Sequence, residues 1–132
     1  MTNPFNSIGI PLEPPPTQPP ICKKCKRASE YFITRRSNRN GNAGRPCYKC
    51  LPCDNFLVFC DRRGNDPENP KCHCGYSSKR QITGRSKSVP GRVHYVCRLG
   101  ECDFYSPSRD ENGQDNVIAG ELADKLSRLS FI

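Results

Sequence analysis

Two short stretches decide the fold of this sequence: GRPCYKC at residues 44–50 and GRVHYVC at residues 91–97. They share the pattern Gly-Arg-x-x-Tyr-x-Cys at an offset of 47 residues, and Cys25 and Cys72 keep the same offset. A repeat that carries its cysteines with it is typical of small structural units in tandem. The sequence therefore predicts two related units side by side.

Eight of the ten cysteines fall into two sets of four, each closed by two short chelating pairs. The first set, Cys-x2-Cys-x24-Cys-x2-Cys, consists of Cys22, Cys25, Cys50 and Cys53. The second set, Cys-x-Cys-x22-Cys-x4-Cys, consists of Cys72, Cys74, Cys97 and Cys102. Such spacing indicates tetrahedral zinc sites of four thiolates, which leave no open position for water or substrate. We therefore expect two structural zinc ions and no enzymatic activity.

The choice of ligand in the first set is open at one point, because Cys47, Cys50 and Cys53 are spaced three apart. Either adjacent pair has chelating spacing. The repeat favours Cys50, which aligns with Cys97, whereas Cys47 aligns with His94. Cys47 and His94 remain possible ligands at this stage.

Two other residues that could bind metal, Cys60 and His73, are expected to lie outside the zinc sites. Cys60 has no counterpart in the second unit, which favours a packing role. His73 stands between Cys72 and Cys74, and the three side chains cannot easily reach one ion, so a surface position is expected.

Composition favours metal over disulfide bonds. Of 132 residues, 34% are apolar and none is Trp, so the chain needs disulfide bonds or bound metal in place of a large core. The first 20 residues contain no apolar run of signal-peptide length, which predicts an intracellular protein with reduced thiols. No stretch approaches the ~20 apolar residues of a membrane span, so we expect a soluble protein without membrane contact.

The expected fold class is small, metal-stabilised and β-rich, with a helix near the C-terminus. Its parts are a disordered proline-rich leader (1–20), a first zinc finger (21–61), a linker (62–70), a second zinc finger (71–106) and a tail (107–132). Strands are predicted at YFIT (31–34), PCYKC (46–50), NFLVF (55–59), RVHYV (92–96) and DFY (103–105).

The segment 116–131 is the one plausible amphipathic helix, with Asn116 as a candidate cap. Its apolar stripe consists of Ile118, Leu122, Leu126 and Leu129. The stripe either packs on the second finger or contacts a protein partner or a second copy of the chain. The second possibility makes a protein-interaction adaptor the alternative function.

Charge is concentrated in the fingers. Residues 21–100 carry 18 Lys and Arg against five acids, although the whole chain has a net charge of only +8. Clustered positive charge predicts a polyanionic partner, most simply a nucleic acid. The densest cluster, expected to contact phosphates without sequence preference, consists of Lys23, Lys24, Lys26, Arg27, Arg35, Arg36 and Arg39.

Both fingers resemble the GRF-type zinc finger, as do tandem pairs in small fungal proteins. In the first finger the motif is carried by Asn42, Gly44, Arg45, Tyr48 and Cys50, followed by Cys53, Phe56, Leu57, Phe59 and Asp61. In the second it is carried by CHCG (72–75), Gly91, Arg92, Tyr95 and Cys97, followed by Cys102, Phe104 and Tyr105. Cys47 and His94 replace a family Phe, Phe59 replaces a Trp, and the second finger lacks the final Trp and Asp.

The resemblance implies two short curved antiparallel sheets that bind single-stranded DNA, and a nuclear location. RNA remains possible, since the contact that separates the two has no sequence signature. Aromatic rings stack on unpaired bases while cations follow the phosphates, which makes the candidate binding residues Arg45, Tyr48, Lys49, Phe56, Arg92, Tyr95, Arg98 and Tyr105. Alternation along a strand lets Arg45 and Lys49 share a face with Tyr48 opposite. Tyr48, Tyr95 and Phe104 have core packing as their alternative role, whereas Arg45 and Arg92 are expected outside a core this small.

Overall fold

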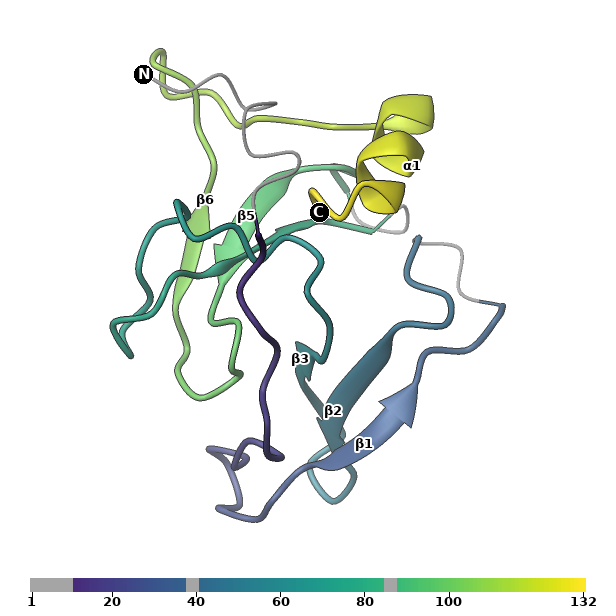
Figure 1. Ribbon diagram of the computed structural model, residues 1–132, viewed down its shortest axis with the longest axis vertical. Coiled ribbons are helices and arrows are strands. Elements are labelled where there is room, and N and C mark those ends of the chain that lie inside the picture. The colour runs from purple at the N-terminus through teal and green to yellow at the C-terminus, as the bar shows by residue number, and fades with distance from the viewer. Residues whose placement is uncertain (1–10, 38–40, 85–87) are drawn as a thin grey trace.

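The computed structural model describes residues 11–37, 41–84 and 88–132, so that the first half of the leader, Arg39, Arg85 and Lys87 lie outside the described residues. Within these ranges the chain forms two three-stranded antiparallel sheets and one helix, which Figure 1 shows beside the second sheet. The first sheet has the order β1-β2-β3, with β1 Glu30–Ile33, β2 Pro46–Cys50 and β3 Asn55–Phe59. The second has the order β4-β5-β6, with β4 Lys79–Ile82, β5 Val93–Val96 and β6 Tyr105–Pro107. The helix α1 is Gly120–Arg128. The predicted fold class is confirmed.

The first sheet follows the predicted strands closely, but its register contains an irregularity that the sequence hides. Lys49 pairs with Phe56, and Tyr48 pairs with Val58, so that Leu57 is left over as a bulge. A bulge inserts one residue and shifts the following side chains to the other face. Phe56 and Phe59, three residues apart, therefore share one face.

The second sheet contains a strand that the sequence analysis does not predict. Strand β4 reads KRQI and has no apolar alternation, yet Lys79 and Arg80 are both buried. Their partners come from outside the second finger, so the local pattern gives no sign of the burial. Strand β6 also begins two residues later than predicted.

Helix α1 is shorter than the predicted 116–131 and begins four residues later. The expected cap is wrong, because Asn116 lies in extended chain, where its carbonyl accepts a hydrogen bond from the Val93 N–H at 2.9 Å. Ala119 occupies the N-cap position without a side-chain hydrogen bond. No helix in the described part of the chain has the length and apolar character to cross a bilayer.

The apolar stripe of the helix is divided between core and surface. The small apolar cluster beside α1 consists of Leu126, Phe131 and Ile132, with Ile82 and Ile118 packed against it. In contrast, Leu122 and Leu129 are exposed. Packing on the second finger therefore accounts for part of the stripe, and contact with a protein partner or a second copy stays a prediction.

Residues 11–20 of the proline-rich leader make polar contacts with the rest of the chain. In the structure these residues lie against the fingers. The Pro14 carbonyl accepts a hydrogen bond from Arg98 at 2.9 Å, and the Glu13 N–H donates to the Asn65 carbonyl at 2.8 Å. Extended, proline-rich chain keeps its carbonyls free to accept hydrogen bonds, so polar contacts fix a segment that has little apolar surface.

The segment 62–70, predicted as a linker, is a buried polar connection between the fingers. Asn65, Asp66 and Asn69 are all buried. The Asn69 amide donates to the carbonyls of Gly64 and Ser78, both at 2.8 Å. Because these buried polar groups are paired, the segment holds the fingers together without apolar packing.

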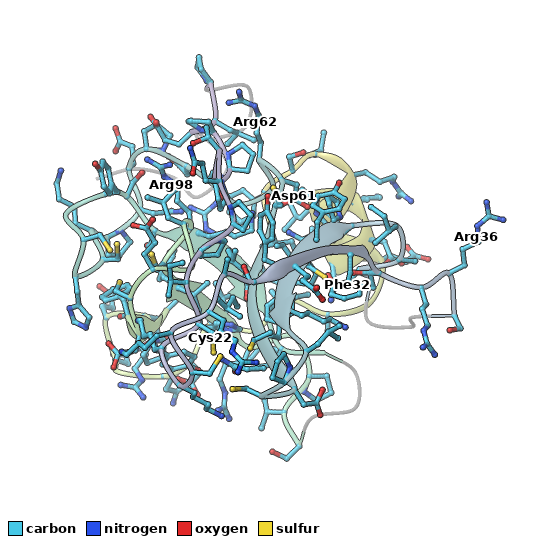
Figure 2. All side chains as sticks on the ribbon, turned by 90° about the horizontal axis from the view of Figure 1, so that it is seen from below. Cys22, Phe32, Arg36, Asp61, Arg62 and Arg98 are labelled. Atoms are coloured by element: carbon cyan, nitrogen blue, oxygen red, sulfur yellow. The ribbon has the colours of Figure 1, made fainter. Side chains whose placement is uncertain are left out.

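Asp61 connects the two fingers through an ion pair on each side. Its carboxylate accepts two hydrogen bonds from the Arg45 guanidinium, at 2.7 and 2.9 Å, and one from Lys79 Nζ at 2.7 Å. Arg45 belongs to the first finger, whereas Lys79 begins β4 and has a fully buried side chain. Burial by itself raises the pKa of Asp61, but the hydrogen bonds from Arg45 and the charge of Lys79 outweigh it and lower the pKa to about 2. Figure 2 shows Asp61 within the body of the molecule, in contrast to Arg36, which extends away from it.

The first prediction concerns this connection. We expect Asp61→Asn to lower the free energy of unfolding by about 3 kcal/mol, because it leaves two cations close together without their anion. Burial already lowers the pKa of Lys79 to about 8, and the substitution removes the carboxylate that raises it. The measurement is denaturant unfolding of the zinc-loaded protein at neutral pH.

Lys79→Met provides the matched control. This substitution removes one buried charge and leaves Asp61 paired with Arg45, so we expect less than half of the Asp61→Asn loss. A loss below about 1 kcal/mol for Asp61→Asn would contradict a central role of the carboxylate.

Candidate metal centres and nucleic-acid surface

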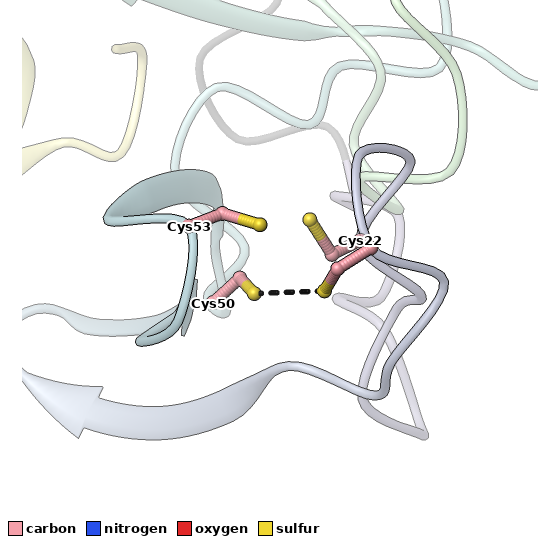
Figure 3. A group of neighbouring side chains, drawn as sticks. Cys22, Cys50 and Cys53 are labelled. Carbon is pink, nitrogen blue, oxygen red and sulfur yellow. Dashed lines mark hydrogen bonds between the residues drawn. The ribbon is translucent and has the colours of Figure 1, made fainter.

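The first cluster of thiols has the geometry of a tetrahedral zinc site. Its four sulfurs, from Cys22, Cys25, Cys50 and Cys53, all lie within 4.8 Å of one another. A Zn–S distance of about 2.3 Å places the sulfurs of a tetrahedron about 3.8 Å apart, and the sulfurs of Cys25 and Cys50 are 3.4 Å apart. Figure 3 shows the side chains of Cys22, Cys50 and Cys53 directed toward one another.

The second cluster repeats this arrangement despite its different spacing. Its sulfurs, from Cys72, Cys74, Cys97 and Cys102, also lie within 4.8 Å of one another, and those of Cys72 and Cys97 are 3.8 Å apart. In both clusters two thiols are buried and two are half-buried. The two groups suit two structural zinc ions, as predicted.

The surroundings lower the pKa of two of the eight cluster thiols and raise the pKa of four. The backbone N–H of Cys25 is the main cause that lowers the pKa of Cys22, to about 6, against the effect of burial. At Cys102 burial raises the pKa, but the backbone N–H of Phe104 and the neighbouring thiols outweigh it and lower the pKa to about 7. In contrast, the hydrogen bond with Cys25, followed by burial, raises the pKa of Cys53 to about 12. Four adjacent sulfurs therefore favour a soft divalent cation, which keeps every thiol deprotonated.

The four doubtful residues all lie outside the clusters. Cys47 is buried in β2, and His94 is buried with its Nδ1 atom 3.3 Å from the Arg92 carbonyl. Cys60 is half-buried, with its Sγ atom 3.8 Å from the Pro16 carbonyl. His73 is exposed, which agrees with the surface position expected for it.

One face of the first sheet gathers aromatic side chains around a lysine. We define the aromatic face by Phe32, Lys49, Phe56 and Phe59. Phe32 and Phe59 both pair with Cys47 from opposite sides, and Lys49 pairs with Phe56. The rings of Phe56 and Phe59 are 4.8 Å apart, and Lys49 Nζ lies 5.9 Å from the Phe32 ring. Lys49 and Phe56 are exposed, and so is Glu30, which pairs with Lys49 from β1. The open end of this face therefore offers a ring, a cation and an anion to solvent.

The opposite face of the first sheet is buried at β2 and β3 and exposed at β1. Tyr48 and Val58 lie on it and are buried, and Tyr48 makes an edge contact with Tyr31 at 5.8 Å. This placement agrees with the expectation that Tyr48 lies opposite Lys49. Of the two roles considered for Tyr48, the structure favours packing.

The expectation that Arg45 and Arg92 stay outside the core is wrong for Arg45 and holds only in part for Arg92. Arg45 is buried, bonds Asp61 and stacks on the Phe59 ring at 3.9 Å. Arg92 is half-buried and forms an ion pair with Asp115 at 3.1 Å. A guanidinium enters so small a core because one planar group satisfies a carboxylate and covers a ring at the same time.

The remaining residues of the predicted binding set are also divided between buried and exposed positions. Arg98 is buried and holds the leader, while Tyr95 is half-buried with the Arg80 guanidinium 5.9 Å from its ring. Tyr105 is 56% exposed and stacks on His94 at 5.2 Å. The structure thus leaves Lys49, Phe56 and Tyr105 accessible among the eight predicted binding residues.

Two residues of the aromatic face are absent from the predicted binding set. Alternation along β1 could have placed Phe32 beside Lys49 once the pairing of β1 with β2 was known. No local pattern could have placed Phe59 there, since the bulge at Leu57 decides its side.

The second prediction concerns the metal. We expect Cys22→Ser to lower the zinc content from two ions to one per chain and to unfold the first finger. The zinc-binding free energy of a small finger, of order 10 kcal/mol, replaces a hydrophobic core. Zinc content is measured with a colorimetric chelator, and folding by circular dichroism.

Cys60→Ser is the matched control, because Cys60 lies outside both clusters and serine can also hydrogen-bond the Pro16 carbonyl. It should retain two ions and the native spectrum. Retention of two tightly bound ions by Cys22→Ser would contradict the assignment of Cys22 as a ligand.

Comparison with known proteins supports this description of the first finger. Residues 19–63 match the family model described as the GRF-like zinc ribbon domain. A solved structure of the tandem zinc finger GRF domains of human NEIL3 is similar at 24% identity, over 70% of this chain and 100% of that chain, with a TM-score of 0.28. No curated protein matches this chain. The matched residues include the first four-thiol cluster and all of β1, β2 and β3, so the resemblance to the GRF-type zinc finger is confirmed over residues 19–63.

Proposed function

We propose that this protein is a non-enzymatic zinc protein that binds single-stranded nucleic acid, DNA in the first place, with little sequence specificity. The observation that carries the proposal is the aromatic face, where accessible rings and an ammonium group share one side of a small sheet. Unpaired bases stack on aromatic rings whatever the base sequence, because every base has a π-face. A duplex hides these faces.

The first finger carries further exposed positive charge outside the aromatic face. The exposed cations of its first chelating loop are Lys23, Lys24, Lys26 and Arg27, and those that follow β1 are Arg35 and Arg36. Figure 2 shows Arg36 directed away from the body of the molecule. These long side chains have room to follow a flexible phosphate backbone without fixing a base sequence.

The thiol clusters support a structural role for the metal. A zinc ion that carries four thiolates has no position left for a water or a substrate. The chemistry of the chain therefore lies in its surface, and the zinc ions hold that surface in shape.

The third prediction concerns stacking. We expect Phe56→Ala to weaken single-strand binding about 5- to 100-fold, because each base–ring contact contributes about 1–3 kcal/mol. Fluorescence anisotropy of a labelled oligothymidine, with zinc-loaded protein at physiological salt, measures the effect. An unlabelled duplex serves as competitor and should displace the strand poorly.

Tyr31→Ala is the matched control for stacking. Tyr31 is 55% exposed but lies on the opposite face of β1 from Phe32. It should leave the affinity within about twofold. Equal losses for Phe56→Ala and Tyr31→Ala would show that the strand does not use the aromatic face.

The fourth prediction separates charge from stacking. We expect Lys49→Gln to reduce the magnitude of the slope of log affinity against log salt by about 0.7, the value for one lost phosphate contact on a single strand. Phe56→Ala should leave this slope unchanged. A slope that is the same in the parent and in Lys49→Gln would place Lys49 away from the phosphates.

A further inference from the structure

We propose that the strand is bound by the first finger alone, and that the second finger stabilises the binding surface without contacting the strand. This inference rests on the proposed function and deepens it by assigning the site to one half of the repeat. Tandem copies ordinarily suggest two equivalent sites that raise avidity. Three independent observations argue against equivalence here.

The first observation is the register of the two sheets, which identifies equivalent positions. Phe32 pairs with Cys47 as Gln81 pairs with His94, so Gln81 occupies the place of Phe32. Lys49 pairs with Phe56 as Val96 pairs with Tyr105.

The second sheet therefore lacks most of the aromatic face. The amide of Gln81 replaces the Phe32 ring, and the apolar side chain of Val96 replaces Lys49. Tyr105 remains exposed at the place of Phe56, but it is already stacked on His94 with ring planes 26° apart. One ring without a neighbouring cation is a poor site for a charged strand.

The second observation is that four cations of the second finger are engaged in contacts within the protein. Lys79 and Arg80 begin β4 and are buried, Lys79 against Asp61 and Arg80 against the Phe131 carbonyl at 3.1 Å. Arg98 is held by the leader through the Pro14 carbonyl and Glu13. Arg92, as described above, is paired with Asp115. These four cations contribute to the net charge of the sequence but are not available to phosphates.

Among the described residues of this region the exposed acids outnumber the exposed cations, while Arg85 and Lys87 lie outside the described residues. In the described residues from 71 to 111, the exposed cations are Lys71 and Arg109, and Arg109 is itself 3.1 Å from Asp115. The exposed acids of the same region are Glu101, Asp103, Asp110 and Glu111. The described part of this surface therefore offers a phosphate backbone less positive charge than the first finger does.

The third observation is the position of the second zinc loop, which packs against β3 on the face of the first sheet opposite the aromatic face. A Cβ atom placed on Gly100 would lie 2.9 Å from Cγ1 of Val58, which is fully buried in β3. The loop that carries Cys97 and Cys102 thus supports the first sheet from behind. At this contact the second finger lies on the side of the first sheet opposite the aromatic face.

The two rings at equivalent register positions, Phe56 and Tyr105, provide the test. In the zinc-loaded full chain we expect Phe56→Ala to weaken oligothymidine binding at least 5-fold, and Tyr105→Ala to change it less than 2-fold. The double variants Lys71→Gln/Arg109→Gln and Arg85→Gln/Lys87→Gln should leave the salt slope unchanged. Three strands about 4.8 Å apart give a face about 10 Å wide, the length of about three nucleotides. Affinity per site should therefore reach a plateau at about six nucleotides, the stacked bases and their flanking phosphates.

The outcomes separate this inference from the proposed function. Equal losses for Tyr105→Ala and Phe56→Ala, a smaller salt slope in either double variant, or a second rise in affinity with longer strands would overturn the one-finger site while leaving single-strand binding intact. Absence of binding by the unaltered chain would overturn both. Weaker binding by Phe56→Ala but not by Tyr105→Ala, with affinity that stops rising at about six nucleotides, supports both the one-finger site and single-strand binding.

Discussion

The Asp61 carboxylate is the constraint on which the arrangement of the two fingers depends. It accepts hydrogen bonds from Arg45 on one side and from the fully buried Lys79 on the other. A buried ammonium without a partner is strongly unfavourable, so the fingers separate only if Lys79 regains water or another anion. The connection is electrostatic because the chain has too little apolar surface to join its halves by packing.

The burial of paired cations also changes what the net charge says about the surface. A net charge of +8 suggests a surface covered with cations. In the structure Arg45, Lys79, Arg80 and Arg98 are buried instead, each with carboxylates or carbonyls as partners. These side chains carry the polar connections that a larger domain would replace with leucine and valine. Among the described residues, the exposed cations are most numerous on the first finger.

Zinc and the β-bulge together explain why a surface rich in phenylalanine remains on so small a protein. Each thiol cluster fixes the ends of its strands, so the sheet does not need both of its faces to form a core. The bulge at Leu57 then turns Phe59 to the same side as Phe56, and the Arg45 guanidinium covers Phe59. One end of that face stays open, which is where the proposed function lies.

The sequence by itself predicted both thiol clusters, because ligand spacing is a local property and the repeat favoured Cys50 over Cys47, a choice that the structure confirmed. It also determined five of the six strands, since alternation and turn residues are local as well. Only the tertiary structure decided the burial of Lys79 and Arg45, the fixed position of residues 11–20, and the side on which Phe59 lies. Each of these depends on a partner far away in the chain or on one unpaired residue in a strand. Ion pairs between distant residues and shifts of register leave no periodic signal in the sequence, whereas chelating pairs do.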